Sequence, residues 1–200
     1  MRTKPPVWAE AMLRLFLRPD VFLSTSGDLL EQYRDSILPS RGLVRADGWY
    51  LTQVLGFAFR TILPWAALFA GASVARFALD MLHPTADFHL RSQVTTYTSI
   101  GLLLAAGFWT AWRSGSFFAG AAAGFATVAA AGIFSMAGTA VLLAFWHDPP
   151  SMSAITASGG LDEAFLLPAF LIVPGIVLGG IGGLVGAGAK RLGRASLLDS

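Results

Sequence analysis

The chain contains no cysteine and few charged residues. Its 200 residues are 54% hydrophobic and only 13% charged, whereas soluble domains average about 25% charged residues. The absence of cysteine excludes disulfide scaffolds, thiolate zinc sites and cysteine nucleophiles. The net charge of +2 is too small to suggest a nucleic-acid-binding protein, which would show a clustered basic face. No nucleic-acid partner is therefore expected.

Charge is scarcest in the C-terminal two thirds of the chain. Between Thr61 and Ala189 the only Lys or Arg residues are Arg76, Arg91 and Arg113. A bilayer-spanning α-helix needs about 20 predominantly apolar residues, and this region holds four such segments. We therefore expect an all-α integral membrane protein with four transmembrane helices, whose lipid partner is the bilayer itself. The predicted spans are about 58–80, 93–112, 117–146 and 163–188.

Basic residues gather at the two ends of the chain. Four crossings return both ends to one side, and segments rich in Lys and Arg stay in the cytoplasm. We therefore expect a multi-pass protein of the bacterial inner (plasma) membrane with cytoplasmic N- and C-termini. The residues concerned are Arg2, Lys4, Arg14, Arg18, Arg34, Arg41 and Arg45 before the first span, and Lys190, Arg191 and Arg194 after the last.

Residues 1–47 have the pattern of a cytoplasmic amphipathic helical module, and residues 48–200 that of the transmembrane domain. A first helix is expected to end before Pro19, and Asp20 can cap a second helix. Together they predict an N-terminal helical hairpin, followed by a turn at Pro39 and Gly42. The second helix has one apolar face, formed by Phe22, Leu29, Leu30, Tyr33 and Ile37.

Glycine pairs at four-residue spacing mark the third and fourth spans. Small residues at this spacing let two helix backbones approach closely in a membrane. We expect the third and fourth helices to pack on each other within one chain; packing against a second copy or a membrane protein partner is the alternative. The glycines are Gly120 and Gly124 in the third span, and Gly175, Gly179 and Gly183, with the pair Gly182 and Gly186, in the fourth.

Isolated polar residues and prolines in and beside the spans have structural interpretations. Arg76 lies near the far end of its span, where it can extend toward the surface and pair with Asp80 one turn along. Pro168 and Pro174 favour a kinked fourth helix over a broken helix that exposes carbonyls to an ion.

No segment carries a recognisable catalytic apparatus. There is no Gly-x-Ser-x-Gly elbow, and the spacing of the three histidines matches no compact metal motif. Loop histidines are the favoured interpretation over a metal site formed with Asp87 and Asp148. We expect neither enzymatic activity nor a cofactor or metal. The histidines are His83, His89 and His147.

The N-terminal segment PPVWAEAMLRLFLRPDVFLSTSGDLLEQYRDSILPSRG, followed by GWYLTQVL, resembles the permease prefix domain found ahead of MacB/FtsX-like ABC permeases in bacteria. The resemblance covers about the first 55 residues, and the rest of the chain departs from that family. It implies a cytoplasmic helical module joined to a different, smaller membrane domain. The matching positions are Pro5, Pro6, Leu13, Leu15, Gly27, Asp28, Leu29, Glu31, Tyr33, Trp49, Tyr50 and Gln53.

Six residues of this segment are candidates for a docking surface: Gly27, Asp28, Glu31, Tyr33, Trp49 and Tyr50. Gly27 would leave room for a close helix, and the acidic residues would meet a basic surface or pair with Arg34. Trp49 and Tyr50 also suit the headgroup level of a membrane. The alternative is that the apolar face of the second helix, Tyr33 included, only packs on the first helix.

Two functions fit these patterns. The first is a non-enzymatic accessory or regulatory membrane protein that docks a cytoplasmic partner, with an ABC-type permease system as the candidate. The alternative is a small transporter or channel subunit formed by oligomerised Gly/Ala-rich helices. Its pathway would be lined by Ser73, Thr95, Thr96, Ser99, Thr127, Ser135 and Thr139.

Overall fold

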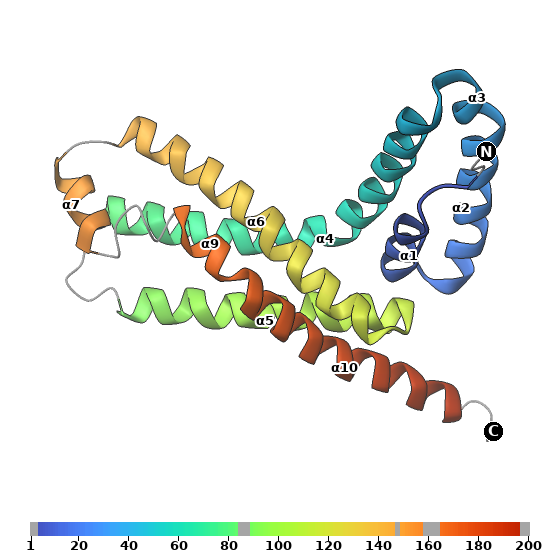
Figure 1. Cartoon of the computed structure of the whole chain (residues 1–200). Coiled ribbons are helices and arrows are strands. Elements are labelled where there is room, and N and C mark those ends of the chain that lie inside the picture. The colour runs from blue at the N-terminus through green and yellow to red at the C-terminus, as the bar shows by residue number, and fades with distance from the viewer. Residues whose placement is uncertain (1–3, 84–88, 147–148, 158–164, 197–200) are drawn as a thin grey trace.

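The computed structural model of the chain describes residues 4–83, 89–146, 149–157 and 165–196, and every element in these ranges is helical (Figure 1). The prediction of an all-α fold is confirmed for this part of the chain. The elements are α1 (Val7–Phe16), α2 (Pro19–Gln32), the π-helical turn η1 (Tyr33–Ile37), α3 (Leu38–Arg41), α4 (Leu43–Leu82), α5 (His89–Ser114), α6 (Phe117–Phe145), α7 (Pro149–Ala157), α9 (Leu167–Phe170) and α10 (Ile172–Ser196).

The N-terminal elements pack around the first part of α4. Ala46, Tyr50 and Val54 recur every four residues, so they share one face of α4, and all three are buried. They close a core with Ala9 and Leu13 of α1, Leu29 of α2 and Tyr33 of η1. We call the part formed by α1, α2, η1, α3 and residues 43–57 of α4 the N-terminal module. Its core extends beyond the boundary predicted at residue 47, because the packing face of α4 continues to Val54.

The second helix continues further than the sequence suggested. Pro39 lies within α3, and the predicted turn is confined to Gly42, whose φ of 73° favours glycine. A proline in a regular helix clashes with the carbonyl four residues earlier. The preceding π turn widens the helix, with the N–H of Leu38 bonded to the carbonyl of Tyr33, and so accommodates Pro39 without ending the helix.

A single helix, α4, joins the N-terminal module to the rest of the chain. It runs for 40 residues and contains Pro64. Figure 1 shows a bend along α4 between its module part and its later part. Proline inside a helix removes a backbone hydrogen bond and kinks the axis, so Pro64 is the residue expected to produce this bend.

The later part of α4 forms a bundle with α5, α6 and α10, and α10 lies across α5 and α6 (Figure 1). The buried apolar side chains of this bundle include Ala66, Phe69, Leu103 and Val128. The α5–α6 connection is the predicted short turn, in which Gly115 has a φ of 80°. Lys190 of α10 donates a hydrogen bond to the carbonyl of Arg113 at 2.6 Å, which satisfies one orphan acceptor at the C-terminal end of α5.

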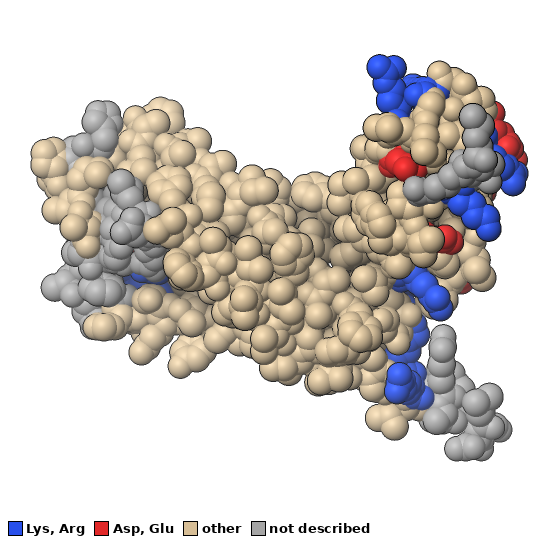
Figure 2. All heavy atoms as spheres, viewed as in Figure 1, with Lys and Arg blue, Asp and Glu red and all other residues tan. Residues whose placement is uncertain are grey.

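Within the described ranges, four helices are long and apolar enough to cross a membrane: α4, α5, α6 and residues 172–193 of α10. They contain the first two predicted spans, the third except for Trp146, and residues 172–188 of the fourth. On the face seen in Figure 2, charged side chains gather over the N-terminal module and near the end of α10, while the middle of the bundle shows none.

Two details of the last third differ from the prediction. Pro149–Ala157 lie between the third and fourth predicted spans, where no helix was predicted, and form the short helix α7, which packs on α4. The fourth span is interrupted at Leu171, between α9 and α10. Hydrogen bonds from Leu171 to Leu167 and from Gly175 to Leu171 cross the interruption, so the helix is kinked and not fully broken, as Pro168 and Pro174 led us to expect. Residues 163 and 164 of that span lie outside the described ranges.

Candidate functional site

The glycines of the third and fourth spans lie in the contact between α6 and α10. A Cβ atom added to Gly120 would stand 2.5 Å from the Cα of Gly183 and 2.6 Å from the carbonyl oxygen of Gly179. One added to Gly124 would stand 2.9 Å from the Cα of Gly179. Gly175 also faces Gly124. The two backbones are therefore in direct contact within one chain, which is the packing favoured from the sequence.

The other glycine pair of α10 faces a different helix. Gly182 and Gly186 lie against the backbone of Leu104 and Phe108 in α5. Gly107 of α5, which the sequence pattern did not single out, lies against the backbone of Gly179. The helix α10 thus has two glycine faces, and it holds α5 and α6 at once. Four-residue spacing reveals that such a face exists, but not which neighbour it meets.

In the N-terminal module, Tyr33 and Tyr50 belong to the interior and not to a docking surface. They are 0% and 1% exposed, and their rings meet edge to face with centroids 6.0 Å apart. The hydroxyl of Tyr33 donates to Asp47 at 2.7 Å, so its polar tip is satisfied without reaching solvent. Neither side chain is available on the surface of this chain for docking, and the alternative interpretation, in which Tyr33 packs within the module, is the one that its burial supports. Trp49 is partly buried against the same core.

The remaining candidates, Gly27, Asp28 and Glu31, are exposed on α2. Gly27 has no atom within 4 Å of a built Cβ, so it provides no close approach between helices of this chain. Arg34 donates from Nε to Asp35 at 2.9 Å, and this hydrogen bond raises the pKa of Arg34 above its usual value. Asp28 and Glu31, one helical turn apart, form the acidic pair that the module presents to its surroundings.

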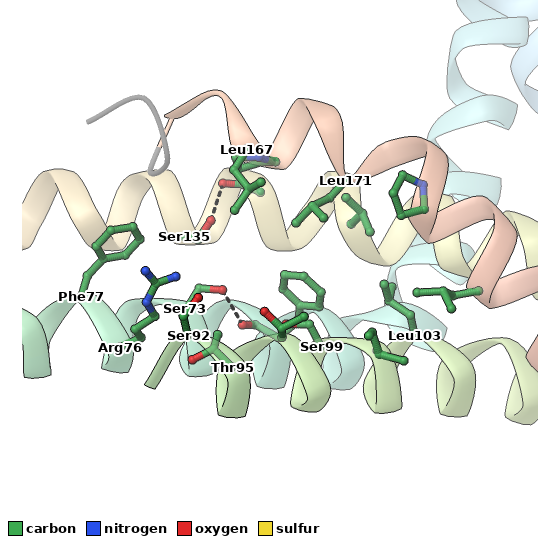
Figure 3. Close-up of a pocket in the computed structure, with 18 residues that line it drawn as sticks. Ser73, Arg76, Phe77, Ser92, Thr95, Ser99, Leu103, Ser135, Leu167 and Leu171 are labelled. Carbon is green, nitrogen blue, oxygen red and sulfur yellow. Dashed lines mark hydrogen bonds between the residues drawn. The ribbon is translucent and has the colours of Figure 1, made fainter. Parts of the chain in front are cut away.

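A cavity of about 350 Å³ opens between α4, α5, α6, α9 and α10. Its volume falls within the range of about 300–1,000 Å³ that is usual for ligand sites. Figure 3 shows hydroxyl side chains from three helices directed toward this space. The polar residues that line it are Ser73 and Arg76 of α4, Ser92, Thr95, Thr96 and Ser99 of α5, and Ser135 of α6.

Arg76 is the one charged residue among the described residues that line the cavity. Its side chain is only 8% exposed, so it does not extend to the surface as expected. The predicted pairing with Asp80 is confirmed, with Nε 3.6 Å from Oδ2. Arg91 contacts the other oxygen of Asp80 at 3.0 Å, so two guanidinium groups share one buried carboxylate. Such a group is costly to bury and marks a functional-site candidate in a membrane protein.

Five of the seven hydroxyl residues proposed as a pathway lining converge on this cavity: Ser73, Thr95, Thr96, Ser99 and Ser135. The other two, Thr127 and Thr139, are 0% and 2% exposed and do not line it. They lie on α6 in helix contacts. The convergence occurs inside one chain, so no oligomer is needed to bring these hydroxyls together.

The structure gives no support for a metal site in the part of the chain that it describes. No group of three or more His, Asp or Glu residues gathers there. His147, Asp87 and Asp148 lie outside the described ranges.

The chain matches no protein-family model, no curated protein and no solved structure.

Proposed function

We propose that this chain is a non-enzymatic integral membrane protein that acts as an accessory or regulatory subunit through its N-terminal module. The observation that carries the proposal is the shared helix α4. It contributes Ala46, Tyr50 and Val54 to the core of the module, and Ala66 and Phe69 to the core of the bundle. A partner that moves the module therefore acts directly on a helix of the bundle.

A second contact couples the two parts. Phe16, at the end of α1, is 4% exposed and packs with Ala58 and Ile62 of α4 and Ala123 of α6. The module thus rests on the end of the bundle as well as on α4. Two attachments resist independent rotation of the module, as expected if docking is to change the bundle.

The membrane location is part of the proposal. The four apolar helices and the basic residues at both ends of the chain support a multi-pass protein of the bacterial inner membrane with both termini in the cytoplasm. In that orientation the module faces the cytoplasm and the cavity lies toward the outer surface.

The proposed docking surface is the acidic pair of Asp28 and Glu31. Both are exposed on α2, and acidic side chains steer and orient a basic partner surface. The resemblance of the first 55 residues to a permease prefix domain makes an ABC-type permease system the candidate partner.

Crosslinking in native membranes tests the docking proposal. A photoreactive amino acid in place of Gln32, which is exposed next to Glu31, should yield a discrete adduct with a permease or ATPase subunit. The double variant Asp28→Asn/Glu31→Gln should reduce the adduct severalfold. Asp20→Asn is the matched control, since Asp20 is also exposed on α2 and pairs with Arg18 at 3.2 Å. The proposed surface would be rejected if no adduct forms, or if Asp20→Asn reduces the adduct as much as the double variant does.

The cavity supports a second candidate function, a small transporter or channel subunit. Its support is the convergence of five hydroxyl residues and Arg76 on one internal space. Uptake into proteoliposomes separates this function from the first. The transporter function would be favoured by a flux that exceeds that of empty vesicles and is lost when Ser99→Phe fills the cavity. Absence of flux would exclude this function.

A further inference from the structure

The first part of α4 has one face that the described part of the chain leaves uncovered. Its opposite face carries Ala46, Tyr50 and Val54 into the core of the N-terminal module. A Cβ atom added to Gly48 or Gly56 would meet nothing within 4 Å, so no described helix approaches this side of α4. In Figure 1, α1 and α2 lie on one side of this segment, and its other side borders the space beside the bundle.

The uncovered face is apolar. Val44, Leu55 and Phe59 are 85%, 47% and 43% exposed, and Leu51 lies among them. Side chains at positions 44, 51, 55 and 59 are separated by whole numbers of helical turns, so they form one row along the helix. We call these four residues the α4 stripe. Contiguous apolar groups of this kind are seldom left in water and mark a protein or membrane contact.

The α4 stripe continues into the apolar surface of the bundle. Phe59 meets Phe134 of α6 edge to face, with ring centroids 6.4 Å apart. Leu63, one turn beyond Phe59 on the same helix, is also exposed. The stripe and the outer surface of α4 and α6 therefore form one apolar surface, which follows the bend of α4 seen in Figure 1. Lipid that covers the bundle can cover the stripe as well.

The charges beside the stripe are basic. Arg45 and Arg60 are exposed, and Asp47 is the one acidic residue in the sequence from 43 to 63. Its carboxylate accepts the hydroxyl of Tyr33 at 2.7 Å, on the side of the module core. The net positive charge beside the stripe complements the negative surface of a cytoplasmic leaflet. A second copy of this chain on the same face would instead bring like charges together.

We propose that residues 44–59 of α4 lie along the surface of the cytoplasmic leaflet and bind anionic lipid. The α4 stripe lies at the boundary between headgroups and acyl chains, and Arg45 and Arg60 contact the headgroups. A helix with an apolar face and basic residues beside it binds a bilayer in this way. The inference rests on the membrane location proposed above. It leaves α2, which packs on the opposite side of the module, toward the cytoplasm.

Spin labels measure which side of the module meets lipid. The chain has no cysteine, so Leu55→Cys and Ser24→Cys can each be labelled alone in the full chain, in vesicles of phosphatidylcholine and phosphatidylglycerol. The label at Leu55 should relax more strongly with oxygen, which dissolves in lipid, than with a water-soluble nickel chelate. Ser24 is exposed on α2, and a label there should show the reverse.

A label on Ile133→Cys, at an exposed position of the apolar helix α6, separates this inference from the membrane location. Lipid exposure at Ile133 with water exposure at Leu55 would overturn the position of the stripe alone. Water exposure at both would overturn the membrane location as well. A label at Leu55 that is shielded from both reagents would assign the stripe to a second copy of the chain and overturn the lipid contact.

Arg45 tests the contribution of anionic headgroups. With phosphatidylglycerol present, Arg45→Gln should lower the ratio of lipid-exposed to water-exposed label at Val44→Cys about fivefold, since one arginine near an anionic surface contributes about that factor. With phosphatidylcholine alone, Arg45→Gln should have no effect. Arg34→Gln, at an exposed residue of η1, is the matched control and should leave the ratio unchanged. Equal effects of the two substitutions, or an equal effect of Arg45→Gln in both lipids, would refute anionic lipid as the partner.

Discussion

The backbones of Gly179 in α10 and Gly124 in α6 lie so close that a Cβ atom on Gly179 would stand 2.7 Å from the Cα of Gly124. The same atom would stand 2.6 Å from the carbonyl oxygen of Gly120. Backbone atoms on both sides cannot move aside as a flexible side chain can. The contact therefore tolerates only glycine, and it holds the two helices in one register.

Gly179→Ala is expected to destabilise the bundle by about 1–3 kcal/mol, the usual cost of overpacking. The measurement is the free energy of unfolding from an SDS titration in mixed micelles. Gly188→Ala on the same helix is the matched control, because a Cβ there meets nothing within 4 Å. Equal stability of the two variants would mean that α6 and α10 are not in this contact.

Tyr33→Phe is expected to destabilise the N-terminal module. The substitution removes the hydroxyl that donates to Asp47 at 2.7 Å, and hydrogen bonds to charged groups contribute about 1.5–3 kcal/mol. Amide hydrogen exchange over residues 19–37, followed by mass spectrometry, measures the local free energy of opening. Tyr97→Phe, at a residue that is 71% exposed, should leave that exchange unchanged. Unchanged exchange in Tyr33→Phe would place its hydroxyl outside the module's interior.

Asp80→Asn is expected to lower the stability of the bundle by about 3 kcal/mol or more, because it removes the carboxylate from a buried ion pair. The side chain of Asp80 is 5% exposed and bridges Arg76 and Arg91. Asp35→Asn removes an ion pair whose two side chains are 57% and 55% exposed, and should cost no more than about 1 kcal/mol. Equal losses from the two substitutions would contradict the buried position of Asp80.

The four long helices could be predicted from the sequence because a run of about 20 apolar residues has few other structural solutions. The glycine spacing likewise predicted a contact face on the third and fourth spans. Neither the apolar runs nor the glycine spacing specifies which helix packs against which. Gly186 faces Phe108 of α5, and Gly107 was missed because it has no glycine partner at four-residue spacing.

The position of the aromatic residues in the module could not be predicted. A tyrosine is compatible with a surface or an interior, and the hydrogen bond of Tyr33 to Asp47 decides between them. That bond joins η1 to α4, so it depends on how the chain turns at Gly42. The helix α7 was missed because Pro149 and Pro150 indicate a loop, although proline also fits the first turn of a helix.

The cavity could be predicted only in part from the sequence. Hydroxyl residues in the spans were recognisable as candidates for a lining, and five of them converge there. The burial of Arg76 was not expected, since an arginine near the end of a span can usually extend to the surface. Its burial follows from the packing of α4 against α5 and α6, which no single helix encodes.

The central claim is that the four helices cross a bilayer and leave the module and the end of α10 on one side. The chain has no cysteine, so single substitutions at exposed positions report one site each: Ser40→Cys in α3, Ser153→Cys in α7 and Leu192→Cys in α10. A membrane-impermeant maleimide applied to intact spheroplasts should label Ser153→Cys, and should label the other two only after permeabilisation. Labelling of Ser40→Cys and Ser153→Cys from the same side, or of Ser40→Cys and Leu192→Cys from opposite sides, would contradict the account.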